Sequence, residues 1–116
     1  MKQPCVYILA SAPYGTLYIG VTSHLLARMH QHRTGEGHGF TCRYGVFRLV
    51  RYEFLADILS AIAREKQLKR WHRQWKINLI ESENRDWHDL APALGLAPVP
   101  FRSATVGTVD PETSSG

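Results

Sequence analysis

Two tyrosines eleven positions apart carry the first chemical signal in this sequence. Tyr7 and Tyr18 each lie in a short run typical of a β-strand, and the Ala-Pro-Tyr-Gly stretch at 12–15 between them is typical of a turn. In an antiparallel hairpin with this loop, we expect Tyr7 opposite Gly20 and Leu9 opposite Tyr18. Because side chains alternate along a strand, both phenols then project from one face as diagonal neighbours. They form a candidate floor for a polar site, with ordinary strand packing as the alternative.

Four further polar residues are predicted to point inward from helices. Arg28 and His32 share the apolar face of the first predicted helix, and Glu65 lies near the centre of the apolar stripe of the second. Asn78 lies beside apolar residues on the third. A buried carboxylate is costly unless it meets a cation, a metal or a hydrogen-bond donor. Each residue has a structural alternative, but together with the two phenols they predict a polar pocket against the sheet.

Hydrophobic periodicity and turn residues predict the elements that position these side chains. The expected elements are strands at about 4–11, 16–22 and 46–54, helices at about 24–34, 58–70 and 73–83, a glycine-rich loop ending near Gly45, and an Asp57 helix cap. This order, ββαβαα, predicts an α+β fold in which a three-stranded antiparallel sheet is flanked by helices.

Length and composition indicate a single small domain. With 116 residues and 44% hydrophobic content, we expect one domain at 1–90. The remainder, 91–116, contains prolines and is rich in Ser and Thr, so we expect it to be disordered beyond about residue 100. Two cysteines without a C-x-x-C pair suit a reducing compartment. No apolar run is long enough to span a membrane and no signal peptide is recognised, so we expect a soluble, cytoplasmic protein.

The charge distribution favours a polyanionic partner. Fourteen Lys and Arg against ten Asp and Glu give a net charge of +4. Residues 64–76 hold six of these cations with Trp71 and Trp75 between them, and further arginines follow the glycine-rich loop. The candidate nucleic-acid-binding residues are Arg43, Arg64, Lys69, Arg70 and Arg73. The alternative is a solvated helix face with the tryptophans buried beneath it.

Five motifs in order resemble the GIY-YIG nuclease domain, and in particular its small standalone bacterial members. They are Cys5-Val6-Tyr7, Tyr18-Ile19-Gly20, Arg28 with His32, Glu65 and Asn78, over approximately residues 4–83. The first motif keeps only the tyrosine of Gly-Ile-Tyr, and the phenol is the group that the chemistry needs. The resemblance implies a nuclease fold and a phosphodiesterase site.

In such a site, the resemblance implies one divalent ion, Mg²⁺ or Mn²⁺, held by Glu65 and completed by water and phosphate oxygens. Tyr7 is then the first choice as general base, with Tyr18 as its partner or a positioning group. Arg28 would clamp the phosphate and supply the positive charge that lowers the pKa of a phenol. His32 would relay the proton or bond to Tyr7.

Asn78 completes the implied site by orienting it or by contacting phosphate. The resulting hypothesis is a metal-dependent endonuclease that acts on DNA, with structured or branched DNA among the candidate substrates. One small site favours a monomer that nicks one strand. The alternative is a nucleic-acid-binding protein that keeps the fold without cutting. A histidine-rich zinc site is disfavoured because the spacings of the four histidines between 24 and 38 do not match a tetrahedral centre.

Overall fold

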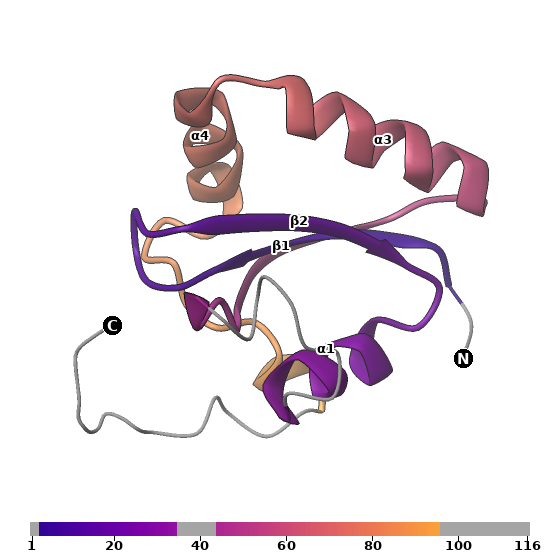
Figure 1. Cartoon of the computed structure of the whole chain (residues 1–116), viewed down its shortest axis with the longest axis horizontal. Helices are drawn as coiled ribbons and strands as arrows, with labels where there is room; N and C mark the ends of the chain where they lie inside the picture. Colours follow the sequence, from indigo (N-terminus) through magenta and orange to yellow (C-terminus); the bar gives the residue numbers. More distant parts are fainter. Residues whose placement is uncertain (1–2, 35–43, 96–116) are drawn as a thin grey trace.

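The computed structural model describes residues 3–34 and 44–95 (Figure 1). The predictions for Arg43 and for the tail beyond residue 100 lie outside these residues. The elements are β1 (Cys5–Ala10), β2 (Leu17–Thr22), α1 (Leu25–Thr34), β3 (Arg48–Phe54), α3 (Ile58–Arg70), α4 (Arg73–Glu83) and a short 3₁₀ helix, η1 (Pro92–Leu94). The predicted α+β class and the order ββαβαα are confirmed, and η1 is added to them.

The sheet has the strand order β2-β1-β3, and both pairings are antiparallel. In the β1–β2 hairpin Tyr7 pairs with Gly20 and Leu9 pairs with Tyr18, so the predicted register is confirmed. The pairing of β1 with β3 shifts between Ile8 and Leu9, which is a β-bulge. The central strand β1 is buried along its whole length.

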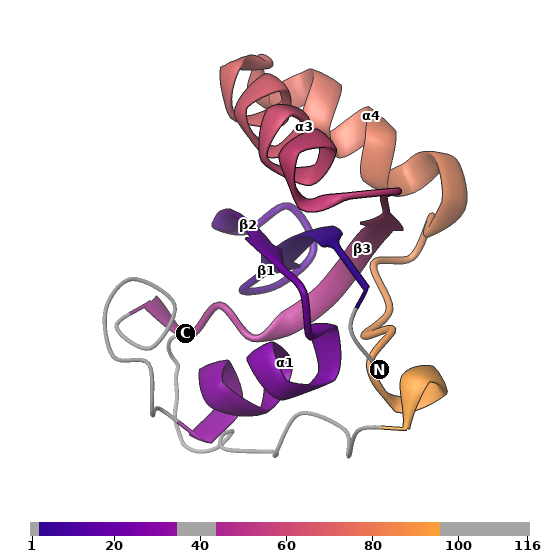
Figure 2. The ribbon, with the colours of Figure 1, turned by 90° about the vertical axis from the view of Figure 1, so that its right-hand side faces the viewer.

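Helices cover both faces of this sheet, so the domain has two hydrophobic cores. Figures 1 and 2 show α3 and α4 on one face and α1 on the other. Because side chains alternate, β1 sends Val6 and Ile8 into the α3/α4 core and Tyr7 and Leu9 into the α1 core. The two tyrosines therefore belong to the face that α1 covers.

Local signals in the sequence explain where α3 begins and ends. Asp57 is extended, and its Oδ1 accepts a hydrogen bond from the backbone N–H of Ser60 at 2.7 Å, so the predicted cap is present. At the other end Trp71 is also extended, and it turns the chain into α4, which begins at Arg73. The result is a sharp α3–α4 corner. No helix within the described parts of the chain is both long and apolar enough to cross a membrane.

After α4 the chain returns across β3 toward α1, through residues 84–91, which we call the return segment. The buried Asn84 donates from Nδ2 to the carbonyls of Val50 and His88 at 3.0 and 2.9 Å. The N–H of Leu90 donates to the carbonyl of Leu49 at 2.8 Å. Trp87 fills the α3/α4 core, and Ala91 is buried in the α1 core. This segment therefore closes the domain along β3.

Candidate functional site

Three side chains that the sequence marks as catalytic candidates meet on the α1 face. Tyr7 comes from β1, Tyr18 from β2 and His32 from the last turn of α1. The Tyr7 Oη and His32 Nε2 atoms are hydrogen-bonded at 3.0 Å. The two tyrosine rings have their centroids 6.3 Å apart, and the imidazole centroid lies 5.6 Å from that of Tyr18. The predicted diagonal arrangement of the phenols is present, and a histidine lies against both.

Arg28 joins this cluster from one helical turn before His32. Leu25 and Met29 are buried on the same side of α1, which turns Arg28 and His32 toward the sheet. The Arg28 guanidinium lies near enough to the Tyr7 phenol to lower its pKa. The phenol oxygen is thus bonded to an imidazole and has a permanent cation nearby.

Burial controls the protonation of this pair. Burial, and then the neighbouring phenol of Tyr18, raise the pKa of Tyr7 above its usual value, although the charge and hydrogen bond of Arg28 oppose the rise. Burial, and then the charges of Arg28 and Arg33, lower the pKa of His32 from 6.5 to about 4. At neutral pH the tyrosine is therefore protonated and the histidine is neutral. When Nε2 carries no proton, the phenol donates its hydrogen bond to it.

Gly20 is required by the same phenol. A Cβ atom at this position would lie 2.4 Å from the Oη and 2.5 Å from the Cζ of Tyr7. These separations are far inside van der Waals contact. The glycine of the Tyr18-Ile19-Gly20 motif therefore makes room for Tyr7, its partner across the hairpin.

Glu65, the proposed metal ligand, lies in the other layer. It is on α3, which packs against β2 and β1 from the face opposite the phenols. Its side chain is 16% exposed, and Oε2 lies 3.0 Å from the Nζ of Lys69. Within the described residues, no three His, Cys, Asp or Glu side chains form a group able to hold a metal ion. A Mg²⁺ or Mn²⁺ ion would fit Glu65 as one hard-oxygen ligand, so its remaining ligands would have to be water and phosphate.

Asn78 is also outside the tyrosine cluster. It is exposed on α4, and its Oδ1 accepts a hydrogen bond from Nε2 of Gln74 at 2.9 Å. Like Glu65, it belongs to the layer of α3 and α4. The structure thus brings four of the six motif residues together, whereas the other two are carried by the helices that cover the opposite face of the sheet.

Two of the candidate nucleic-acid-binding arginines are held by the protein itself. Arg64 donates to both carboxylate oxygens of Glu53, at 2.8 and 3.1 Å, and to Gln67 at 2.7 Å. Arg73 donates to the carbonyls of Tyr14 and Gly15, both at 2.7 Å, and so fixes the hairpin loop to α4.

The other candidates differ in their availability. Arg70 is exposed, and Lys69 is half-exposed beside Glu65.

Sequence reasoning missed the partly buried acidic partners of the arginines. Glu53 binds both Arg51 and Arg64. Arg51 and Glu53 are two positions apart on β3, so their side chains lie on the same face of the strand. That spacing could have predicted the Arg51–Glu53 pair. Asp89 accepts from Nη2 of Arg33 at 2.7 Å, and the arginine side chain is only 6% exposed. Their separation of 56 positions leaves no local pattern that pairs them.

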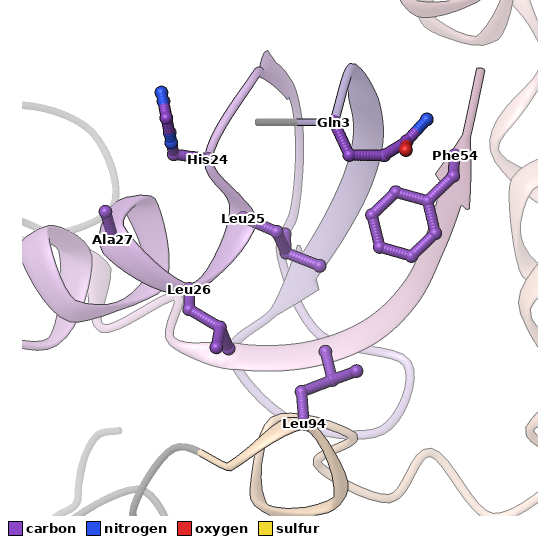
Figure 3. A pocket seen from close by; sticks show the side chains of 7 residues that line it. All are labelled: Gln3, His24, Leu25, Leu26, Ala27, Phe54 and Leu94. Atoms are coloured by element: carbon purple, nitrogen blue, oxygen red, sulfur yellow. The ribbon is translucent and has the colours of Figure 1, made fainter. Parts of the chain in front are cut away.

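An apolar pocket of about 580 Å³ lies at another place, between the start of α1, the end of β3 and η1 (Figure 3). Leucine and phenylalanine side chains point into it, with Gln3 and His24 at its border. Its described lining residues include no phenol, carboxylate or guanidinium, so this pocket does not coincide with the tyrosine cluster.

Comparisons with known proteins show the family to which this chain is related. A family model described as the GIY-YIG catalytic domain matches residues 3–78. A UPF0213 protein of Clostridium perfringens is 35% identical over 79 residues, which cover 68% of this chain and 84% of that protein. A UPF0213 protein of Staphylococcus haemolyticus is 32% identical over 81 residues, 70% of this chain and 98% of that one.

A solved structure is also similar to this chain. The solution NMR structure of a UPF0213 protein from Bacillus halodurans matches with a TM-score of 0.49 at 26% identity, and covers 82% of this chain and 99% of that one. The family model alone spans well over half of the sequence, through both tyrosines, α1 and Glu65. The chain therefore belongs to the GIY-YIG catalytic-domain family.

Proposed function

We propose that this chain is a metal-dependent endonuclease that hydrolyses phosphodiester bonds in DNA. Membership in the GIY-YIG family indicates a nuclease-type function. The observation that carries the proposal further is the 3.0 Å hydrogen bond between a buried phenol, Tyr7, and an imidazole that is neutral at pH 7, His32. Hydrolysis requires a group that removes a proton from water, and this pair supplies one.

The raised pKa of Tyr7 decides how the pair would work. A protonated phenol is not a base by itself, so it accepts a proton from water only as it gives up its own. In the proposed step, the water O–H bond breaks toward Tyr7 Oη while the phenolic proton passes to His32 Nε2. The imidazole becomes the final acceptor, and the water oxygen becomes the nucleophile.

The remaining members of the cluster handle charge and position. Arg28 lies near the phenol and is always charged, so it would stabilise the negative charge that develops on Tyr7 and clamp the scissile phosphate. Tyr18 would position the water or phosphate from the next strand. Asn78 would contact the DNA backbone from α4.

The proposed metal ligand is Glu65, with Mg²⁺ or Mn²⁺ as the ion. When bound, this ion would supply positive charge to the phosphorane-like transition state and to the leaving oxygen. A single carboxylate, already paired with Lys69 at 3.0 Å, makes weak ion binding the expectation until DNA adds its phosphate oxygens.

Further features of the proposal concern the partner and its setting. We propose that DNA is bound through exposed cations, Lys69 and Arg70 first, with Arg43, Arg64 and Arg73 contributing. One site in a monomeric chain would nick one strand. The buried thiol of Cys5, which is free of any disulfide, suits the reducing conditions of the cytoplasm.

Cleavage of supercoiled plasmid tests the proposal. The wild-type protein should nick it with Mg²⁺ or Mn²⁺ and not with a chelator present. Glu65→Gln, Tyr7→Phe and His32→Gln should each reduce the rate at least about tenfold, in line with the loss of a general base or a charge-stabilising group. Tyr14→Phe, which removes a phenol at the exposed hairpin tip, is the matched control and should cut normally. Equal rates in all variants would refute the proposed chemistry.

A second candidate function is nucleic-acid binding without cleavage. The observation that favours it is that Glu65 is carried by α3, a helix on the face of the sheet opposite α1, and is paired with Lys69 at 3.0 Å. This function predicts that DNA binds equally well with a chelator and with metal, that Glu65→Gln leaves binding unchanged, and that no metal produces nicks.

A further inference from the structure

The α3–α4 corner exposes an aromatic surface that the proposed active site does not use. Trp75 is 54% exposed, although a buried indole is available for comparison in Trp87, which is 1% exposed. Trp71 is partly buried against the α3/α4 core. The alternative in which both tryptophans lie beneath the helix surface therefore does not hold for Trp75. The large apolar ring of Trp75 is therefore exposed to water and does not contribute to the core.

The Trp75 ring is exposed, but its orientation is fixed. Its centroid lies 5.9 Å from that of Trp71, with 83° between the ring planes, and 5.5 Å from that of His72, with 89° between the planes. Two nearly perpendicular neighbours hold the indole without covering it. The Arg64 guanidinium lies 5.4 Å from the centroid of Trp71, and its bonds to Glu53 hold it there. The aromatic corner is thus pre-organised.

The surroundings of this ring are strongly basic. Residues 64–76 contain six Lys or Arg side chains and a single carboxylate, that of Glu65. Among the described residues, Lys66, Arg70 and Lys76 have no acidic partner within salt-bridge distance. The corner therefore complements a polyanion that also presents flat apolar groups.

We propose that Trp75, supported by Trp71 and His72, is a stacking platform for the unpaired bases of single-stranded DNA. Inside a duplex both faces of a base are covered by its neighbours, so an exposed indole gains a partner only where a strand is unpaired. Lysines and arginines alone would suffice for a duplex, which is bound through its phosphates. This inference rests on the proposed nuclease function, and it names the substrate class as DNA with a single-stranded segment.

The distance to the proposed metal ligand fits this assignment. Glu65 lies on α3, and Trp71, six residues later, is the C-cap of that helix, which corresponds to about 9 Å along the helix axis at 1.5 Å per residue. A strand whose phosphate lies at Glu65 therefore has a base within a few nucleotides of the platform.

Binding measured without cleavage tests the platform. The probes are a fluorescein-labelled oligothymidylate and a labelled blunt-ended hairpin duplex, titrated in chelator so that no strand is cut. Trp75→Leu, which keeps apolar bulk without a flat ring, should weaken oligothymidylate binding by about fivefold to a hundredfold, the loss of one stacked base. Trp75→Phe should stay within about threefold of wild type, since a π-face is retained. Duplex binding should be the same in all three proteins.

A second measurement needs no variant. Oligothymidylate should quench the tryptophan fluorescence of the wild-type protein, because Trp75 is the exposed indole, and the duplex should not. The platform would be overturned if Trp75→Leu lost the same affinity for single strand and duplex. It would also be overturned if Trp75→Leu lost no affinity and the wild-type protein showed no quenching. Either outcome would leave a protein partner for this corner. A protein that stacks single strands but never nicks plasmid would refute the nuclease and keep the platform. If the protein nicks plasmid normally and Trp75 has no role in binding, the platform is refuted and the nuclease is kept.

Discussion

Replacing Gly20 with alanine should destabilise the fold by an amount that one contact determines. The new Cβ would lie 2.4, 2.5 and 3.0 Å from the Oη, Cζ and Cε2 atoms of Tyr7, whereas carbon atoms in contact prefer about 3.5–4.0 Å. The tyrosine ring is fully buried and bonded to His32, so it has little room to move. Overpacking costs about 1–3 kcal/mol, and loss of the hydrogen bond adds about 1 kcal/mol.

Alanine is otherwise the better residue in a strand, by about 0.5–1 kcal/mol, so the expected net loss is about 1–3 kcal/mol. A double-mutant cycle isolates the cause. Tyr7→Leu removes all three of the atoms that the new methyl group would meet. In this background, Gly20→Ala should be neutral or slightly stabilising. Urea unfolding of the four proteins at neutral pH gives the coupling energy, which should be at least about 1 kcal/mol.

Gly45 supplies the matched control. Its φ is +65°, and a Cβ there would meet nothing within 4 Å, so Gly45→Ala costs about 1 kcal/mol through backbone strain alone. This cost should be the same with and without Tyr7→Leu. If Gly20→Ala also costs the same in both backgrounds, the glycine is not there to accommodate the phenol, and the reasoning fails.

Three further predictions concern charge. The pKa of His32 is about 4 in the folded chain and 6.5 when unperturbed, so the unfolded chain binds the extra proton first and stability falls as the pH drops from 6.5 to 4. The loss in the free energy of unfolding is about 3 kcal/mol or less. In His32→Gln this dependence of stability on pH should be smaller, as measured by urea unfolding at both pH values. An unchanged dependence in the variant would contradict the assignment. Replacing Lys69 and Arg70 together with alanine should weaken DNA binding and lower the slope of log K against log salt by about 1–2, whereas an unchanged slope would move the binding surface elsewhere. Asp89→Asn should lower the free energy of unfolding by roughly 3 kcal/mol in urea unfolding, because it leaves the buried side chain of Arg33 without its counter-charge. The control Asp86→Asn, at an exposed position, should cost less than about 0.5 kcal/mol. Equal costs would mean that the Arg33–Asp89 pair does not stabilise the fold.

Local rules predicted the elements and the tyrosine pair well. A four-residue loop and strict alternation determine the register of a hairpin, so the pairing of Tyr7 with Gly20 followed from the sequence. The Asp57 cap followed from its position before an apolar helix, and the inward side of Arg28 and His32 from their spacing with Leu25 and Met29.

The layer to which each helix belongs did not follow in the same way. Periodicity shows that a side chain such as Glu65 faces a core, but this domain has one core on each side of β1, and the sequence does not say which. The availability of the arginines was equally hidden. Arg64 and Arg73 look like their exposed neighbour Arg70 in the sequence, yet their partners lie 11 and 59 residues away along the chain.

The return segment has a consequence for the order in which the fold is completed during synthesis. The family model ends at residue 78, but Asn84, Trp87 and Asp89 lie beyond it and hold β3, the α3/α4 core and Arg33. A ribosome makes the arginine 56 residues before its counter-ion. Until the return segment has been synthesised, Arg33 lacks its counter-ion Asp89 and the α1 core lacks Ala91. The α1 core draws its residues from Cys5 to Leu94, so it can be completed only after the return segment has left the ribosome.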